Sequence, residues 1–187
     1  MAKIYTKNGD RGITNLYDMR KLGKDDLFFE VLGDIDELSS HIGLARILLS
    51  YQEMTTPILL NIQRKLMDIS SDIATTKEQA REKLKFIDEI DTKKLEVYID
   101  EFWEDLPKLT EFIIPGYKQP DAQIHICRAI CRRVERHMWA LRKQCEANET
   151  PLATSLEVFK YINRLSDFFF ALARVFSQGK DVVRSEI

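Results

Sequence analysis

Long stretches without glycine constrain the fold of this chain more than any other feature. Four of its seven glycines lie within the first 33 residues, and after Gly43 only Gly116 and Gly179 follow. Glycine weakens helices, and the glycine-free stretches carry apolar residues at the three- and four-residue spacing of amphipathic helices. The sequence therefore predicts an all-α protein, a bundle of helices behind a glycine-containing N-terminal segment.

The apolar stripes predict five helices, and Asp34 is expected to cap the first one, with Asp91 or Thr92 capping the third. The expected helices cover residues 34–50, 57–75, 91–106, 120–145 and 156–177. The charged stretch 75–86 either extends the second helix or links it to the third, and a non-helical connection precedes the fourth. The predicted organisation is one domain over residues 1–187, divided into an N-terminal segment (1–32), the helical bundle (33–178) and a C-terminal tail (179–187).

Composition narrows the class of protein. A chain of 187 residues suffices for one domain with a sizeable core. The net charge of −2 supplies no global positive field for nucleic acid, and no apolar run is long enough to span a membrane. The start lacks a signal-peptide core, so a cytoplasmic location is expected. Cys127 and Cys131 are expected in the core rather than on a metal, because no second Cys or His pair completes a site.

The fourth predicted helix carries a row of basic residues on one face. In "HICRAICRRVERHM", His125, Arg128, Arg132 and Arg136 recur three or four residues apart. Such a row is either a solvated, salt-bridged face or a site for an anion, since the planar guanidinium group binds phosphate and carboxylate oxygens in pairs.

Polar residues elsewhere are candidates for the same site. Asn163 and Asp167 are poor helix formers within the fifth helix, where they share a face with Phe170 and Arg174, so they either contact a ligand or bond to another helix. Asp36 is a candidate partner for an arginine.

The N-terminal stretch "TKNGDRGITN" contains two glycines that allow backbone N–H groups to turn toward an anion. It lacks the GK[ST] of a Walker A motif. Lys24 is in position to reach the same anion.

Taken in order, these stretches resemble the PduO-type ATP:cob(I)alamin adenosyltransferases, or corrinoid adenosyltransferases. The resemblance runs from Lys3 to about Phe176 and rests on "YTKNGDRGITNLY", "KDD", "GDIDELSSHIGLAR", "FIIPG", "HICRAICRRVERH" and "YINRLSDFFFALAR". It implies a five-helix up-and-down bundle, related to ferritin-like folds, that forms a homotrimer with one active site at each subunit interface. It also implies transfer of the 5′-deoxyadenosyl group of ATP, with Mg²⁺, to the cobalt of cob(I)alamin, itself made from cob(II)alamin; the products are adenosylcobalamin and triphosphate.

The resemblance also implies roles for single residues. Arg132 and Lys24 stabilise the triphosphate, Arg128 pairs with Asp36 across the interface, and Phe112 covers the lower face of the corrin and excludes the axial ligand. No protein side chain is expected to ligate a metal. The ATP site is assigned to Thr6, Lys7, Asn8, Gly9, Asp10, Arg11, Gly12, Ile13, Thr14, Asn15 and Lys24 of one subunit and to Arg132, Arg133, Glu135, Arg136 and Asn163 of its neighbour.

Two alternatives belong to other classes. A di-iron bundle needs Glu-x-x-His pairs, which none of the three histidines provides. A nucleotide- or corrinoid-binding sensor or chaperone, which delivers the product to an adenosylcobalamin-dependent enzyme, needs no chemistry of its own.

Two positions depart from the family pattern: Tyr117 stands where a second glycine usually follows "PG", and Asn8 replaces a common threonine.

Overall fold

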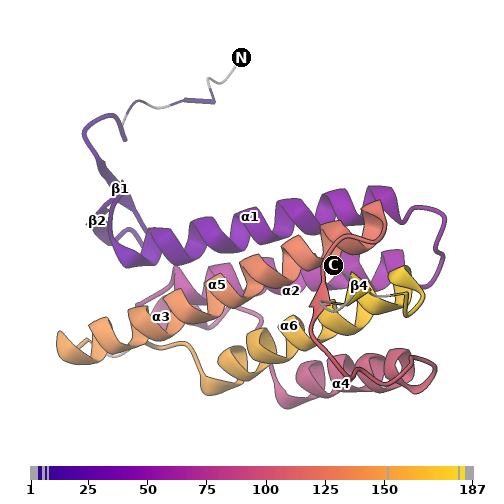
Figure 1. Ribbon diagram of the computed structural model, residues 1–187. Coiled ribbons are helices and arrows are strands. Elements are labelled where there is room, and N and C mark those ends of the chain that lie inside the picture. The colour runs from indigo at the N-terminus through magenta and orange to yellow at the C-terminus, as the bar shows by residue number, and fades with distance from the viewer. Residues whose placement is uncertain (1–3, 6, 8, 151, 181, 184–187) are drawn as a thin grey trace.

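The computed structural model describes residues 4–5, 7, 9–150, 152–180 and 182–183, and long helices dominate it (Figure 1). The helices within these ranges are α1 (Leu27–Leu48), α2 (Thr55–Ile73), α3 (Glu78–Arg81), α4 (Glu89–Glu104), α5 (Gln119–Ala147) and α6 (Leu156–Ser177). The strands are β1 (Ile13–Asn15), β2 (Lys21–Gly23), β3 (Ile113–Ile114) and β4 (Val182–Val183). The prediction of a mostly helical protein is confirmed.

The long helices lie side by side, and α1 packs against both α2 and α5, while α6 packs against α5 and α4 (Figure 1). Their apolar stripes meet in one core, in which Ile42, Leu66, Val134, Leu165 and Phe168 are fully buried. Burial of apolar area on this scale is the main force that holds amphipathic helices together. Across the described residues, no helix combines the length and hydropathy that crossing a bilayer requires.

The predicted helix bounds hold best at α6, which runs from Leu156 to Ser177 as expected. The predicted start of the first helix was wrong, because α1 begins at Leu27 and its N-cap is Asp26, whose side chain accepts a hydrogen bond from the backbone N–H of Phe28. Asp34 therefore lies well inside the helix and caps nothing. The "GD" pair at 33–34 resembles a helix start, but the helix continues through Gly33 because Val31 and Ile35 on either side are buried in the core.

The charged stretch after α2 is a link, not an extension. Arg81 of the single-turn helix α3 donates from Nη1 to the carbonyls of Asp72 and Thr75, and its Nη2 pairs with the Asp72 carboxylate. These bonds satisfy carbonyls that the end of α2 leaves without helical partners. Helix α4 then starts from Asp88, not from Asp91 or Thr92, and Asp91 is the second member of its capping box.

The cysteines behave as predicted for core residues. Cys127 and Cys131 are fully buried and unpaired with any other thiol. Burial raises the pKa of Cys127 to about 12, so this thiol stays protonated and is a poor metal ligand.

An N-terminal hairpin is fixed to the end of the bundle by one carboxylate. Strands β1 and β2 pair antiparallel, and the buried Asp18 between them accepts hydrogen bonds from the backbone N–H of Arg20, Thr76 and Lys77 and from the Thr76 hydroxyl. Burial acts to raise the pKa of Asp18, but these hydrogen bonds together lower it below its usual value of 3.8. The hairpin is thereby held against the C-terminal end of α2.

A second, unpredicted pairing joins distant parts of the chain. β3 lies antiparallel to β4, with Ile113 opposite Val183 and Ile114 opposite Val182. Gly179 turns the chain toward this pairing at a φ of 64°, against Pro107, where a β-carbon would meet the proline ring at 2.6 Å. The segment that contains Phe112 is therefore held by the C-terminal strand.

Candidate functional site

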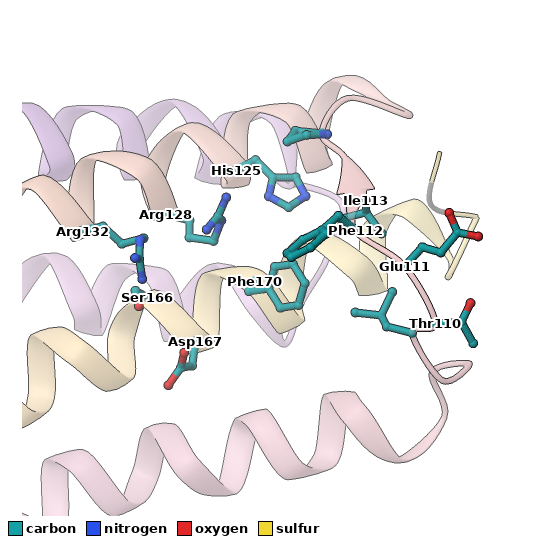
Figure 2. Close-up of a pocket in the computed structure, with 12 residues that line it drawn as sticks. Thr110, Glu111, Phe112, Ile113, His125, Arg128, Arg132, Ser166, Asp167 and Phe170 are labelled. Carbon is teal, nitrogen blue, oxygen red and sulfur yellow. The ribbon is translucent and has the colours of Figure 1, made fainter. Parts of the chain in front are cut away.

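A groove of about 630 Å³ runs between α5, α6 and the segment that leads into β3 (Figure 2). Helix α5 contributes basic side chains, α6 contributes polar and aromatic ones, and the segment contributes mostly apolar ones together with Thr110 and Glu111. The lining residues are Leu109, Thr110, Glu111, Phe112, Ile113, Pro115, His125, Arg128, Arg132, Ser166, Asp167 and Phe170. We call this the Phe112 groove.

The basic wall of the groove consists of Arg128 and Arg132, one turn apart on α5 (Figure 2). The Arg128 guanidinium carbon lies 5.8 Å from the ring centre of Phe170, and its Nε is buried with no hydrogen-bond acceptor among the described residues. Burial lowers the pKa of Arg128, and the positive charge of Arg132 lowers it further. This wall lacks a negative partner within the described part of the chain.

Phe112 is not a core residue, because 88% of it is exposed. The loop behind it is nevertheless ordered by the buried carboxylate of Asp121, which accepts from the backbone N–H of Gly116 at 3.2 Å, of Tyr117 at 3.1 Å and of Lys118. Gly116 takes a φ of 110°, whereas Tyr117 is not in the positive-φ region, so the backbone accepts its side chain. A large apolar side chain presented on an ordered loop is suited to contact a ligand.

The remaining predicted residues of α5 and α6 lie on the exposed side. Asn163 donates to Glu135 Oε1 at 3.1 Å, and Arg136 Nη1 donates to the carbonyl of Arg132 at 3.1 Å. The interpretation of Asn163 as an inter-helix hydrogen-bonding residue is confirmed. Arg174 is buried instead: its Nη2 donates to the Pro107 carbonyl at 2.7 Å.

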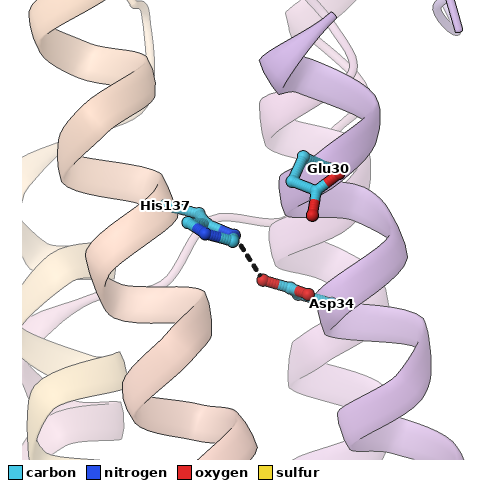
Figure 3. A group of neighbouring side chains, drawn as sticks. All are labelled: Glu30, Asp34 and His137. Atoms are coloured by element: carbon cyan, nitrogen blue, oxygen red, sulfur yellow. Dashed lines mark hydrogen bonds and ion pairs between the residues drawn. The ribbon is translucent and has the colours of Figure 1, made fainter. Parts of the chain in front are cut away.

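Arg133 lies apart from Arg128 and Arg132, on the side of α5 that faces α1. It binds Asp34 at 2.9 Å and also Glu37, and Asp34 accepts a second bond from His137 at 2.7 Å (Figure 3). Glu30, Asp34 and His137 have the spacing of a metal site. A cation there would be repelled by the Arg133 guanidinium, so the trio is better explained as a polar contact between the two helices.

The predicted residues of the N-terminal segment gather around a second hollow of about 1070 Å³. It is lined by Lys7, Gly9, Asp10, Arg11, Ile13, Thr14, Asn15, Met19 and Lys21. Lys24 joins them, because its backbone N–H donates to the Gly12 carbonyl at 2.8 Å and a β-carbon at Gly9 would lie 3.0 Å from its Nζ. Glycine at this position therefore admits the lysine ammonium. Thr6 and Asn8 lie outside the described residues.

The residues of the predicted ATP site line two different hollows, one at the hairpin and the other, which includes Arg132, beside the Phe112 segment. The hairpin lies at the end of the bundle where α1 begins, and the Phe112 segment lies at the opposite end (Figure 1). The hollow at the hairpin and the Phe112 groove share no lining residue. Asp36 lines a third groove between α1 and α2, away from Arg128.

Asp121 is a functional candidate that sequence reasoning missed. The sequence signal for it is its position in the first turn of α5, just after Pro120. An acidic side chain there can accept hydrogen bonds from backbone N–H groups of the loop that precedes the helix.

Comparison with known proteins adds one family and several relatives. The family model described as "Cobalamin adenosyltransferase" matches residues 4–176. A corrinoid adenosyltransferase of Bacillus subtilis is 44% identical over 176 residues, covering 92% of this chain and 86% of its own. A corrinoid adenosyltransferase of Bos taurus is 40% identical over 180 residues, covering 93% and 71%. A solved structure of a variant PduO-type ATP:corrinoid adenosyltransferase from Lactobacillus reuteri, complexed with cobalamin and ATP, is 34% identical with a TM-score of 0.86, covering 97% of this chain and 98% of that one.

Proposed function

Because this chain belongs to the cobalamin adenosyltransferase family, we propose that it transfers the 5′-deoxyadenosyl group of ATP to the cobalt of cob(I)alamin. The products are adenosylcobalamin and triphosphate. The observation that carries the proposal is the Phe112 groove, in which an exposed aromatic ring and two guanidinium groups line one cavity.

The reaction needs no protein nucleophile. Cobalt(I) supplies both electrons of the new cobalt–carbon bond, the bond between C5′ and the triphosphate oxygen breaks, and triphosphate leaves with that electron pair. The protein holds C5′ close to cobalt and stabilises the charge that builds on the leaving group. A guanidinium about 4 Å from a phosphate charge contributes roughly 4 kcal/mol at an effective dielectric near 20, before desolvation. Arg132 and Arg136 of α5 take this role, together with Lys24.

Phe112 prepares the cobalt. An axial ligand raises the orbital that accepts the electron when cob(II)alamin is reduced, so reduction becomes easier when the ligand is displaced. An exposed phenylalanine ring on a loop that Asp121 holds rigid can occupy the lower face of the corrin and exclude that ligand. The Lactobacillus reuteri structure carries a phenylalanine-to-alanine substitution, which is consistent with a functional phenylalanine in this family.

The complete site is assigned to an interface in a homotrimer of five-helix, up-and-down bundles. Two observations support this assembly: the buried Nε of Arg128 has no acceptor among the described residues, and the hairpin hollow shares no lining residue with the groove that Arg132 lines. Asp36 of a neighbouring subunit supplies the acceptor for Arg128. The hairpin of that neighbour supplies Lys7, Gly9 to Asn15 and Lys24 to the nucleotide. A cytoplasmic location and delivery of the product to a dependent enzyme belong to the same proposal.

The lining of the hairpin hollow suits a polyanion rather than a free cation, so Mg²⁺ would enter it bound to the triphosphate. This ion is bound mainly by substrate phosphates and water, with one or two carboxylates from the protein. Lys7, Arg11 and Lys21 line the hollow with Asp10, so the triphosphate and water would hold the ion, in keeping with the expectation that no protein side chain ligates a metal. The bound ion would add positive charge next to the leaving group.

Incubation of the protein with ATP, Mg²⁺ and chemically reduced cobalamin tests the proposal. We expect the absorbance change of cobalt–carbon bond formation and release of one triphosphate for each adenosylcobalamin. A sensor or chaperone would bind both compounds with neither change, and release of ADP or pyrophosphate would point to a different reaction.

A further inference from the structure

A second groove adjoins the Phe112 groove, and no step of the proposed reaction uses it. It measures about 530 Å³, lies between α4 and α6, and shares Asp167 and Phe170 with the Phe112 groove. A hollow of roughly 300–1,000 Å³ is typical of sites for small organic ligands. The shared residues make the two grooves neighbours along one wall, so one ligand can extend from the first into the second.

The floor of this α4–α6 groove is aromatic. The ring centres of Trp103 and Phe170 lie 6.0 Å apart, and the guanidinium of the buried Arg174 lies 4.8 Å from the Trp103 ring centre. Trp103 is nevertheless 40% exposed, so part of its ring surface remains open. A tryptophan supported by a buried cation and left open to solvent is a stacking surface for a planar aromatic group.

The rim of the groove is acidic. Glu96, Asp100 and Asp167 line it against a single guanidinium, and that guanidinium, from Arg164, already binds Glu96 at 3.1 Å and Asp167 at 2.7 Å. The negative charge of this rim repels a phosphate group and favours a neutral or basic aromatic ring.

The proposed reaction frees a ring of this kind from cobalt. When Phe112 displaces the lower axial ligand of cobalamin, a benzimidazole base on a nucleotide tail is released from cobalt, and its freed nitrogen is basic. The geometry points to the α4–α6 groove as the site that receives this displaced base, stacked on Trp103, with the phosphate of the tail outside. This inference rests on the proposed function, because it takes a corrinoid as substrate.

Cobinamide, the corrinoid without the nucleotide tail, separates the inference from the proposed function. In Trp103→Ala we expect the KM for cob(I)alamin to rise roughly five- to 150-fold, the range that stacking of a base on an aromatic side chain supplies, while the KM for reduced cobinamide stays constant. Trp103→Phe should retain most of the affinity for cob(I)alamin. Tyr51→Ala, at an exposed aromatic residue far along the chain, is the matched control.

Asp100→Arg gives a second test that does not disturb packing, because Asp100 is exposed. It reverses a charge at the rim and should raise the KM for cob(I)alamin alone. Equal changes for both corrinoids in these variants, or no change for either, would overturn the inference, as would a rise in the KM for ATP in Trp103→Ala. If the unaltered protein adenosylates neither corrinoid, the proposed function itself fails.

Discussion

Removal of Asp36 should weaken assembly and activity together, although this residue lies far from Arg128 in its own chain. The buried Nε of Arg128 has no acceptor in the described part of the chain, and burial and the charge of Arg132 both oppose the positive charge of Arg128. Truncating one partner of a hydrogen-bonded charge pair at an interface costs about 2–5 kcal/mol. Because each 1.4 kcal/mol is tenfold, Asp36→Ala should raise the subunit dissociation constant roughly thirty-fold to several thousand-fold.

Sedimentation velocity over a range of protein concentrations measures this constant for Asp36→Ala, Arg128→Ala and the double variant. If the two residues pair across subunits, the double variant is little worse than either single variant, with a coupling energy of at least about 1.5 kcal/mol. Glu101→Ala, an exposed acidic residue of α4, is the matched control and should assemble normally. Additive effects of the two substitutions would refute the pairing.

Three further predictions concern the other parts of the site. Phe112→Ala should slow the reaction from cob(II)alamin far more than from chemically prepared cob(I)alamin, and equal losses in the two assays would show that Phe112 does not act by excluding the axial ligand. Asp121→Ala removes three hydrogen bonds to a carboxylate, each worth about 1.5–3 kcal/mol. It should slow the reaction from cob(II)alamin more than that from cob(I)alamin, by less than Phe112→Ala does, and it should speed hydrogen exchange of Gly116 to Lys118. Unchanged exchange would count against the role of Asp121 in ordering the loop. Because the pKa of Asp18 is lowered in the folded protein, its contribution to stability is present above pH 3.8 and is lost as the pH falls through the folded value. Acid should therefore release the hairpin from α2 in the unaltered protein, whereas Asp18→Asn should release it at neutral pH. Limited proteolysis measures this release, and equal cleavage of the two proteins at pH 7 would contradict the prediction.

Helical periodicity predicted most of the fold because the helices bury wide apolar stripes. Phe159, Leu165 and Phe169 define α6 without help from the rest of the chain. The start of α1 escaped prediction because Asp26, the true cap, lies in a polar stretch with several possible caps. The two-residue pairing of β3 with β4 escaped because it joins segments far apart in sequence, and two residues carry no periodicity.

The candidate site, like the fold, could be predicted from the sequence only in part. Motif order supplied the candidate residues, but helical spacing cannot tell which neighbour a side chain contacts. Arg133 follows Arg132 directly, yet it binds Asp34 and Glu37 of α1 while Arg132 lines the groove. Arg174 shares a predicted face with Asn163, yet it is buried against Trp103.

Mixed trimers test the central claim most directly. Lys24→Ala disables the hairpin half of the site and Arg132→Ala disables the α5 half, so each variant alone should lose about a hundredfold or more in turnover, as loss of one stabilising group typically does. When the two chains are assembled together in equal amounts, about a quarter of the interfaces combine an intact hairpin with an intact Arg132. The account predicts that the mixture recovers about a quarter of the unaltered activity; a mixture no more active than either parent would place the site within one chain and contradict it.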